Sequence, residues 1–273
     1  MSFAVYILIF LGYFASFVCY GFDLVFEEEG ALLYGKRLLF SSLLAHGVSL
    51  VVSVSREPRW VAAYFSESLY LVSFLLVLLL WILERRFGVR FFVLFSLPVV
   101  LLLYLLAVLS MGRQGDSLGS ALFSKWLWIH TGFIWGGLAG FVAAVSCALM
   151  YLFQSWQLKS KRWGKLFVNL PSLQTLDRFH FAFLSIGAIL FSLGILGGLF
   201  WAKEIKEMGG LWRDPKVFLS FLTCAVYWSV LGLRLSSLRR GQKIAAGTVL
   251  VFGLLFVTLM SSTYAPSGFH AGF

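Results

Sequence analysis

Eight long apolar runs divide this chain of 273 residues and constrain its fold more than any other feature. A helix needs about 20 apolar residues to cross the hydrocarbon core of a bilayer. Phe, Leu and Val dominate the runs, which lack the short alternating segments typical of a membrane β-barrel. We therefore predict an all-α, polytopic membrane helix bundle. Its eight spans are expected at about 3–22, 37–55, 62–83, 91–111, 127–153, 180–202, 217–234 and 244–262.

The composition agrees with an integral membrane protein, because 60% of the residues are hydrophobic and only 12% are charged. Soluble domains average about 25% charged residues, so this chain has too few to cover a surface in water. The first run, MSFAVYILIF, has no preceding Lys or Arg and no small-residue cleavage site, which predicts a retained span rather than a signal peptide. We expect a single membrane domain over 1–273, with two helices in 1–60 and a larger region in 61–273.

The positions of Lys and Arg predict the orientation of the chain, since cytoplasmic loops of membrane proteins are enriched in both. With the N-terminus outside, most of the 22 basic residues fall in cytoplasmic loops, as in ERRFGVR and KSKRWGK. Eight spans then return the C-terminus to the outside. These clusters beside an anionic lipid leaflet explain the net charge of +10, so no nucleic-acid partner is expected. We expect the protein to lie in a bacterial inner membrane.

Three segments converge on the outer face in this orientation. His130 begins a long apolar span, His270 lies close to the C-terminus, and GGLWRDPK separates two apolar spans between them. Two neutral imidazoles suit low-spin haem iron, and aromatic walls suit the porphyrin. The sequence thus permits a haem pocket with two histidine ligands and an aromatic floor.

Three further ionisable residues need an explanation. His46 lies near the middle of the second span, where an ionisable side chain is costly and often functional; the alternative is a neutral imidazole hydrogen-bonded to a neighbouring helix. His180 begins the sixth span, where we expect it at the inner interface. Glu67, near the outer end of the third span, is either a pocket residue or an interfacial carboxylate paired with Arg56 or Arg59.

The sequence argues against several kinds of metal, nucleotide and ion-transport site. Cys19, Cys147 and Cys224 are isolated within apolar runs, and neither a CxxC pair nor a CxxCH motif occurs, which argues against a zinc site and covalent haem. The chain has no phosphate-binding glycine-rich loop, dinucleotide fingerprint or HExxH motif. Acidic residues within spans are scarce, which disfavours ion-coupled transport. Four glycines of the sixth span are spaced for close helix packing: Gly187, Gly194, Gly197 and Gly198.

Several phrases of the sequence resemble one known family. They are FSESLYLVSFLLVLLLWILERRFGVR, WIHTGFIWGGLAGFVAAVSCALMYLFQ, LPSLQTLDRFHFAFLSIGAILFSLGILGGLFWA, GLWRDPK and GFHAGF. Together they make the stretch from about 60 to 270 similar to the CcsA/ResC cytochrome c assembly proteins, and most similar to the shorter HemX-like branch. GLWRDPK stands where that family has its tryptophan-rich WWD loop.

The resemblance implies that the chain binds haem b non-covalently at its outer face and delivers it to an apocytochrome c. His130 and His270 would be the axial ligands of the haem iron, and Trp212, Asp214 and Pro215 would belong to the loop that covers the porphyrin. The outer loops are short, so a membrane partner with a large outer domain would hold the apocytochrome. Candidate partners of the haem propionates, chosen by charge and side alone, are Arg113, Lys125, Arg213 and Lys216.

The chain also departs from the family pattern. Only Trp212 remains of the loop's tryptophans, Val217 replaces a glutamate, and the seventh span reads YWSVLGLRL without the family's histidine. His46, in LLAHGVSL, resembles the early histidine of the HemX-like group and is a further candidate haem ligand, as Glu67 is a further pocket residue. We expect no enzymatic activity beyond a component of a cytochrome c haem lyase. The alternatives are a HemX-like regulator of haem biosynthesis, a small-molecule transporter without haem, and a structural subunit that recruits assembly factors.

Overall fold

The computed structural model describes residues 3–56, 65–111, 124–161, 170–204, 212, 214–236 and 241–264. Within these residues the chain forms eight α-helices and no strand. Each helix is long and apolar enough to cross a bilayer. The prediction of an all-α polytopic membrane protein with eight spans is confirmed.

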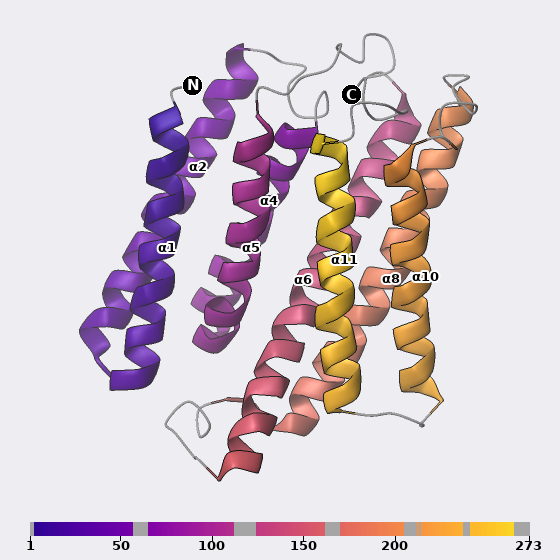
Figure 1. The fold of residues 1–273 in the computed structure, drawn as a ribbon. Coiled ribbons are helices and arrows are strands. Elements are labelled where there is room, and N and C mark those ends of the chain that lie inside the picture. Colours follow the sequence, from indigo (N-terminus) through magenta and orange to yellow (C-terminus); the bar gives the residue numbers. More distant parts are fainter. Residues whose placement is uncertain are drawn as a thin grey trace. The chain divides into compact units, whose positions relative to one another are not determined.

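The helices follow the predicted spans closely (Figure 1). They are α1 (Phe3–Phe26), α2 (Glu29–Arg56), α4 (Phe65–Phe87), α5 (Arg90–Ser110), α6 (Lys125–Ser160), α8 (Leu173–Glu204), α10 (Pro215–Leu235) and α11 (Gln242–Tyr264). The largest differences are at α2, α6 and α8, which have 28, 36 and 32 residues. The polar residues that end an apolar run still favour a helix, so α6 reaches about 54 Å and exceeds the roughly 30 Å hydrocarbon core.

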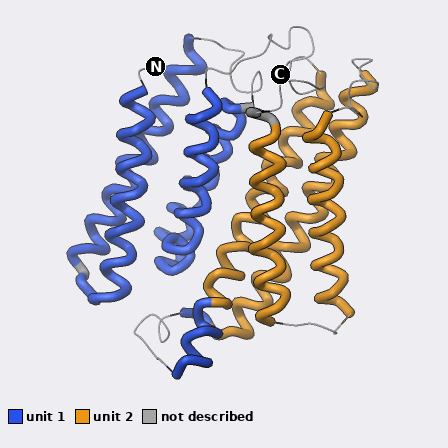
Figure 2. The backbone as a smooth tube through the Cα atoms, viewed as in Figure 1, with its two compact units in different colours: residues 1–61, 66–111, 153–171 blue, residues 62–65, 112–152, 172–273 orange. Residues whose placement is uncertain are grey.

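The chain divides into two compact units (Figure 2). Unit 1 comprises residues 1–61, 66–111 and 153–171, and unit 2 comprises residues 62–65, 112–152 and 172–273. Each unit is described by itself below. The single domain expected over the whole chain stays a prediction.

Unit 1 is built around the packing of α1 against α2 and α5. Small residues bring α1 and α2 together, and the Ser16 hydroxyl donates a hydrogen bond of 2.9 Å to the carbonyl of Gly35. A short connection joins α4 to α5, where Gly88 has a φ of +65° that favours glycine. Two ion pairs lie at this end of the unit: Lys36 with Glu84 at 2.9 Å, and Arg90 with Asp23 at 3.0 Å.

Unit 2 depends on a close crossing of α6 and α8. A Cβ atom added at Gly140 would lie 2.8 Å from the Cα atom of Gly187, and one added at Gly187 would lie 2.7 Å from the Phe141 ring. The backbones can approach this closely only because both positions lack side chains. Tyr227 of α10 stacks on Phe141 at 3.7 Å between ring centroids, which adds α10 to this core.

The end of unit 2 opposite His130 holds a buried polar cluster. Arg234 of α10 forms a short ion pair with Asp177 of α8, and His180 shares a hydrogen bond of 2.9 Å with Thr248 of α11. His180 is only 3% exposed, so its side chain is covered by the bundle, and its position at the inner membrane interface stays a prediction. Because α8 begins at Leu173, two turns before the apolar run, His180 lies inside the helix and faces the bundle.

Candidate functional site

His130 lies in the second turn of α6, at one end of unit 2, and is partly exposed. Its Nδ1 atom is 2.6 Å from the carbonyl oxygen of Gly194 on α8. A carbonyl oxygen can only accept, so Nδ1 carries the proton and donates this hydrogen bond. In the neutral ring the lone pair is then on Nε2, which has no hydrogen-bond partner among the described residues. His130 can therefore offer Nε2 to a metal.

One aromatic ring lies beside this imidazole, and a stacked aromatic pair lies close by at the same ends of α6 and α8. The Trp201 ring of α8 is buried and lies nearly parallel to the His130 ring, at 6.4 Å between centroids and an interplanar angle of 21°. Trp126, one turn before His130, stacks on Phe200 at 4.7 Å. These aromatic residues were not among the predicted site residues. The spacing of Trp201, seven residues or two helical turns after Gly194, places it on the same face of the helix and could have identified it.

Polar contacts join the ends of α6 and α8 beside these aromatic rings. The Ser124 hydroxyl donates a short hydrogen bond to the Glu204 carboxylate and accepts one of 3.2 Å from the backbone N–H of Trp126. Ser124 therefore acts as a helix cap, satisfying an N–H group that has no partner within the first turn. These contacts fix the end of the helix pair that carries His130.

The residues at the start of α10 have a structural role that was not predicted from the sequence. Asp214 is 4% exposed, and its Oδ1 atom accepts a hydrogen bond of 2.8 Å from the backbone N–H of Lys216. Pro215 occupies the first helical position, where its fixed φ fits and its missing N–H costs nothing. Asp followed by Pro before an apolar run is a recognisable start signal for a helix. Asp214 and Pro215 thus form the N-terminal cap of α10.

The Lys216 ammonium of α10 lies within electrostatic range of the His130 imidazole. His130 and the Asp214–Lys216 segment therefore lie at the same end of unit 2, and their joint role in a haem site stays a prediction. Trp212 is 64% exposed, and its ring lies 6.2 Å from that of Phe221. The exposed Trp212 ring therefore presents an aromatic surface at this end of unit 2.

Part of the predicted site lies outside the described residues. This applies to His270, the second predicted axial ligand, and to Arg113 and Arg213. Lys125, the remaining candidate partner of the propionates, is exposed in the first turn of α6. The pairing of His130 with His270 stays a prediction.

His46 has a different environment, in the core of unit 1. Its imidazole is fully buried and shares a hydrogen bond of 3.2 Å with the Tyr13 hydroxyl. The rings of Tyr70, Tyr104 and Phe74 lie between 4.1 and 5.4 Å from it. Among the described residues its Nε2 atom has no hydrogen-bond partner, although the Tyr70 backbone makes a weaker polar contact with the ring. This geometry matches the structural alternative, an imidazole hydrogen-bonded to a neighbouring helix.

Glu67 lies in the first turn of α4 and is only 3% exposed. The Ser66 hydroxyl donates a hydrogen bond of 2.8 Å to its carboxylate, which also interacts electrostatically with Tyr6. Arg59, one of its two predicted ion-pair partners, lies outside the described residues. Both interpretations of Glu67 stay predictions.

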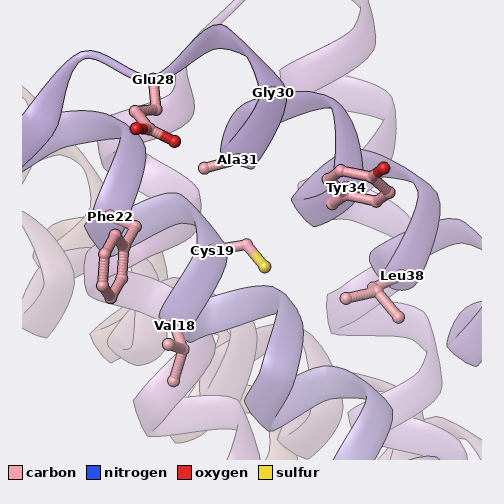
Figure 3. A pocket seen from close by; sticks show the side chains of 8 residues that line it. All are labelled: Val18, Cys19, Phe22, Glu28, Gly30, Ala31, Tyr34 and Leu38. Atoms are coloured by element: carbon pink, nitrogen blue, oxygen red, sulfur yellow. The ribbon is translucent and has the colours of Figure 1, made fainter.

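A hollow of about 450 Å³ lies between α1 and α2 in unit 1 (Figure 3). The Cys19 sulfur and the Glu28 carboxylate point into it in the figure. The residues that line it are Val18, Cys19, Phe22, Glu28, Gly30, Ala31, Tyr34 and Leu38. It contains no histidine, so it is not a candidate for histidine ligation of haem. The described residues also hold no cluster of three or more His, Cys, Asp or Glu side chains suited to a bare metal ion.

Comparisons with known proteins agree with the resemblance seen in the sequence. Protein HemX of Bacillus subtilis is 27% identical over 204 residues, which cover 72% of this chain and 74% of that protein. Protein HemX of Brevibacillus brevis is 30% identical over 155 residues, covering 57% and 56% of the two chains. The cytochrome c biogenesis protein CcsA of Prochlorococcus marinus (strain MIT 9301) is 23% identical over 270 residues, covering 89% and 87%. No solved structure matches the chain.

The family comparison covers most of the molecule. The pattern that describes the family named "Cytochrome C assembly protein" matches residues 60–270. This range contains α4 to α11, His130 and the Asp-Pro cap of α10, and it also includes His270. The chain therefore belongs to the cytochrome c assembly protein family.

Proposed function

We propose that this protein binds haem b at the outer face of a bacterial inner membrane and delivers it during cytochrome c assembly. His130 and His270 are the axial ligands in this proposal. The observation that carries it is the hydrogen bond from Nδ1 of His130 to the Gly194 carbonyl, which leaves Nε2 as the coordinating nitrogen. Membership of the cytochrome c assembly family and the likeness to CcsA proteins support it.

The hydrogen bond is the kind of contact that metal-ligating histidines make. Such residues usually donate their second ring N–H to a carbonyl or carboxylate, which fixes the tautomer and makes the ligating nitrogen more basic. His130 makes this contact with a helix backbone, whose position varies little. Its imidazole is thereby prepared to bind iron in one orientation.

The surroundings of His130 also suit the rest of a haem molecule. Haem, when bound, supplies the iron and the porphyrin that a c-type cytochrome requires. Trp201 and Trp126 offer apolar ring surfaces of the kind that line cofactor sites. Lys216, which interacts electrostatically with His130, provides a cation for a haem propionate. Asp214 and Pro215 hold Lys216 in place by starting α10 beside it.

Delivery requires a second protein. The segments that connect the spans are short, so they provide no surface large enough to hold an apocytochrome c. In the proposal a membrane partner with a large outer domain presents the apocytochrome to the His130 end of unit 2. The outer location of this end follows from the distribution of Lys and Arg.

Absorbance spectra of the purified protein test the haem site. Spectra of the oxidised and dithionite-reduced wild type are compared with those of His130→Ala and His270→Ala. We expect a low-spin spectrum in the wild type and its loss, or a change to high spin, in both variants. His180→Gln is the control, because this histidine lies at the opposite end of unit 2. Wild-type protein without haem after reconstitution, or unchanged low-spin haem in both alanine variants, would overturn the proposal.

A HemX-like role in regulating haem biosynthesis is the second candidate function. It is favoured by the likeness to two HemX proteins and by the single tryptophan in GLWRDPK. Deleting the gene separates the two functions. A role in assembly predicts loss of covalently bound haem in c-type cytochromes with little change in total haem. A regulatory role predicts changed amounts of haem-biosynthesis enzymes, with c-type cytochromes matured in the usual proportion.

A further inference from the structure

Two adjacent glycines of α8, Gly197 and Gly198, face His130. A Cβ atom added at Gly198 would lie 2.9 Å from Nδ1 and 3.0 Å from Cε1 of the imidazole. One added at Gly197 would lie 3.1 Å from the Cα atom of His130. Real Cβ atoms essentially never approach another heavy atom to less than 3.0 Å. The imidazole can therefore keep its position only if residue 198 has no side chain.

The same two glycines uncover the acceptor of the His130 hydrogen bond. In an α-helix the carbonyl of one residue points toward the N–H of the fourth residue after it. The carbonyl of Gly194 therefore points toward Gly198, and the side chains that normally flank it are those of residues 197 and 198. Both are glycine, so a second donor can reach this carbonyl from the side. That donor is Nδ1 of His130, at 2.6 Å.

We propose that Gly198, assisted by Gly197, is a positioning residue of the haem site. By leaving the Gly194 carbonyl open and making room for the ring, it fixes the His130 tautomer and directs Nε2 away from α8. This inference rests on the proposed haem function and assigns to α8 a part in tuning the iron. A hydrogen bond to Nδ1–H makes the imidazole a stronger donor, which favours low-spin iron and lowers its reduction potential.

Close helix packing is the simpler explanation for these glycines, and the chain provides a control that separates the two. Gly187 lies on the same helix, and a Cβ atom added there would meet the Phe141 ring at 2.7 Å. The clash is at least as severe as the one at Gly198, but it occurs about two turns from Gly194 and about three turns from Gly198. Gly187→Ala therefore disturbs helix packing without touching the imidazole.

The test compares Gly198→Ala and Gly187→Ala in the full-length protein, purified with haem. The measurements are the haem content per protein, the low-spin fraction from absorbance and electron paramagnetic resonance, and the reduction potential. We expect Gly198→Ala to reduce haem content by roughly tenfold or more, as is typical when a group that orients a metal ligand is lost. The haem that remains should shift toward high spin and toward a higher potential. Gly187→Ala should lower thermal stability and leave the spectrum and potential of its bound haem unchanged.

A milder variant keeps the test valid if Gly198→Ala does not fold. In Gly197→Ala the added Cβ atom meets the backbone of His130, with the Cα atom at 3.1 Å, and its three nearest neighbours include no ring atom. The ring is therefore displaced less, while the Gly194 carbonyl is still partly covered. We expect the same shifts in spin state and potential, at smaller amplitude. Equal spectral shifts in Gly187→Ala and Gly198→Ala would overturn the inference, as would a wild-type spectrum and potential in Gly198→Ala. Absence of haem from the wild type would instead overturn the proposed function.

Discussion

The two units of this molecule each place a histidine inside an apolar helix, and the two imidazoles differ in which nitrogen is accessible. In unit 1, His46 is enclosed by aromatic rings, and its Nε2 atom is buried with no hydrogen-bond partner in the described part of the chain. In unit 2, His130 is partly exposed and has its Nδ1 atom occupied by a backbone carbonyl. The ring nitrogen that remains is therefore enclosed in His46 and accessible in His130. The surroundings of His46 thus suit packing, and those of His130 leave a ring nitrogen free to bind a metal.

Among the variants that test this comparison, His130→Ala should have the largest effect, a loss of haem affinity. In the proposed site His130→Ala removes an axial ligand, so the haem affinity should fall by more than the roughly 10–100-fold typical when only a group that orients a ligand is removed. Haem per protein, measured as the pyridine haemochrome, checks this. A haem content equal to that of the wild type would contradict the idea that His130, unlike His46, binds the iron.

Replacing His46 should instead affect stability. His46→Ala removes a buried ring from the aromatic core and leaves Tyr13 without its partner, so the free energy of unfolding should fall by about 2–4 kcal/mol. Thermal unfolding in detergent measures this loss. The outer haem spectrum should stay that of the wild type once the protein is folded. Loss of haem from a folded His46→Ala protein would show that the enclosed histidine also serves haem binding.

Tyr13→Phe provides a finer test of the His46 environment. It keeps the aromatic ring and removes only the hydroxyl that bonds to His46, so a loss of about 1 kcal/mol is expected. The same unfolding measurement applies, with haem content as the control. A change in haem content larger than the change in stability would contradict a purely structural role.

Lys216→Gln should give the smallest effect, on the His130 side of the comparison. The backbone N–H of residue 216 still caps Asp214, so the helix start is preserved. Removal of the cation should weaken haem binding by about 1 kcal/mol or less, since partly exposed ion pairs contribute little. The reduction potential should fall, because a nearby positive charge favours the reduced iron. A titration with haem at low and high salt measures the first effect, which high salt should diminish.

The start of α10 shows how far reasoning from the sequence could go. GLWRDPK was singled out as a functional loop, while the structure gives Asp214 and Pro215 a local role as a helix cap. The signal was present, because an Asp-Pro pair before an apolar run marks a helix start. No sequence pattern predicts that Lys216 comes within electrostatic range of His130, because this depends on how α10 packs against α6 and α8.

The sequence by itself determined the eight spans and therefore the class of fold. The reason is physical: the thickness of the bilayer fixes the length of an apolar run, and only helices satisfy the backbone within each run. It also determined the family, because the matching phrases are continuous segments of the chain. The tertiary structure alone decided that His180 is buried, that His46 is enclosed, and that the Gly194 carbonyl accepts a hydrogen bond from Nδ1–H of His130. These depend on contacts between helices far apart in the chain, and the period of a single helix contains no information about its neighbours.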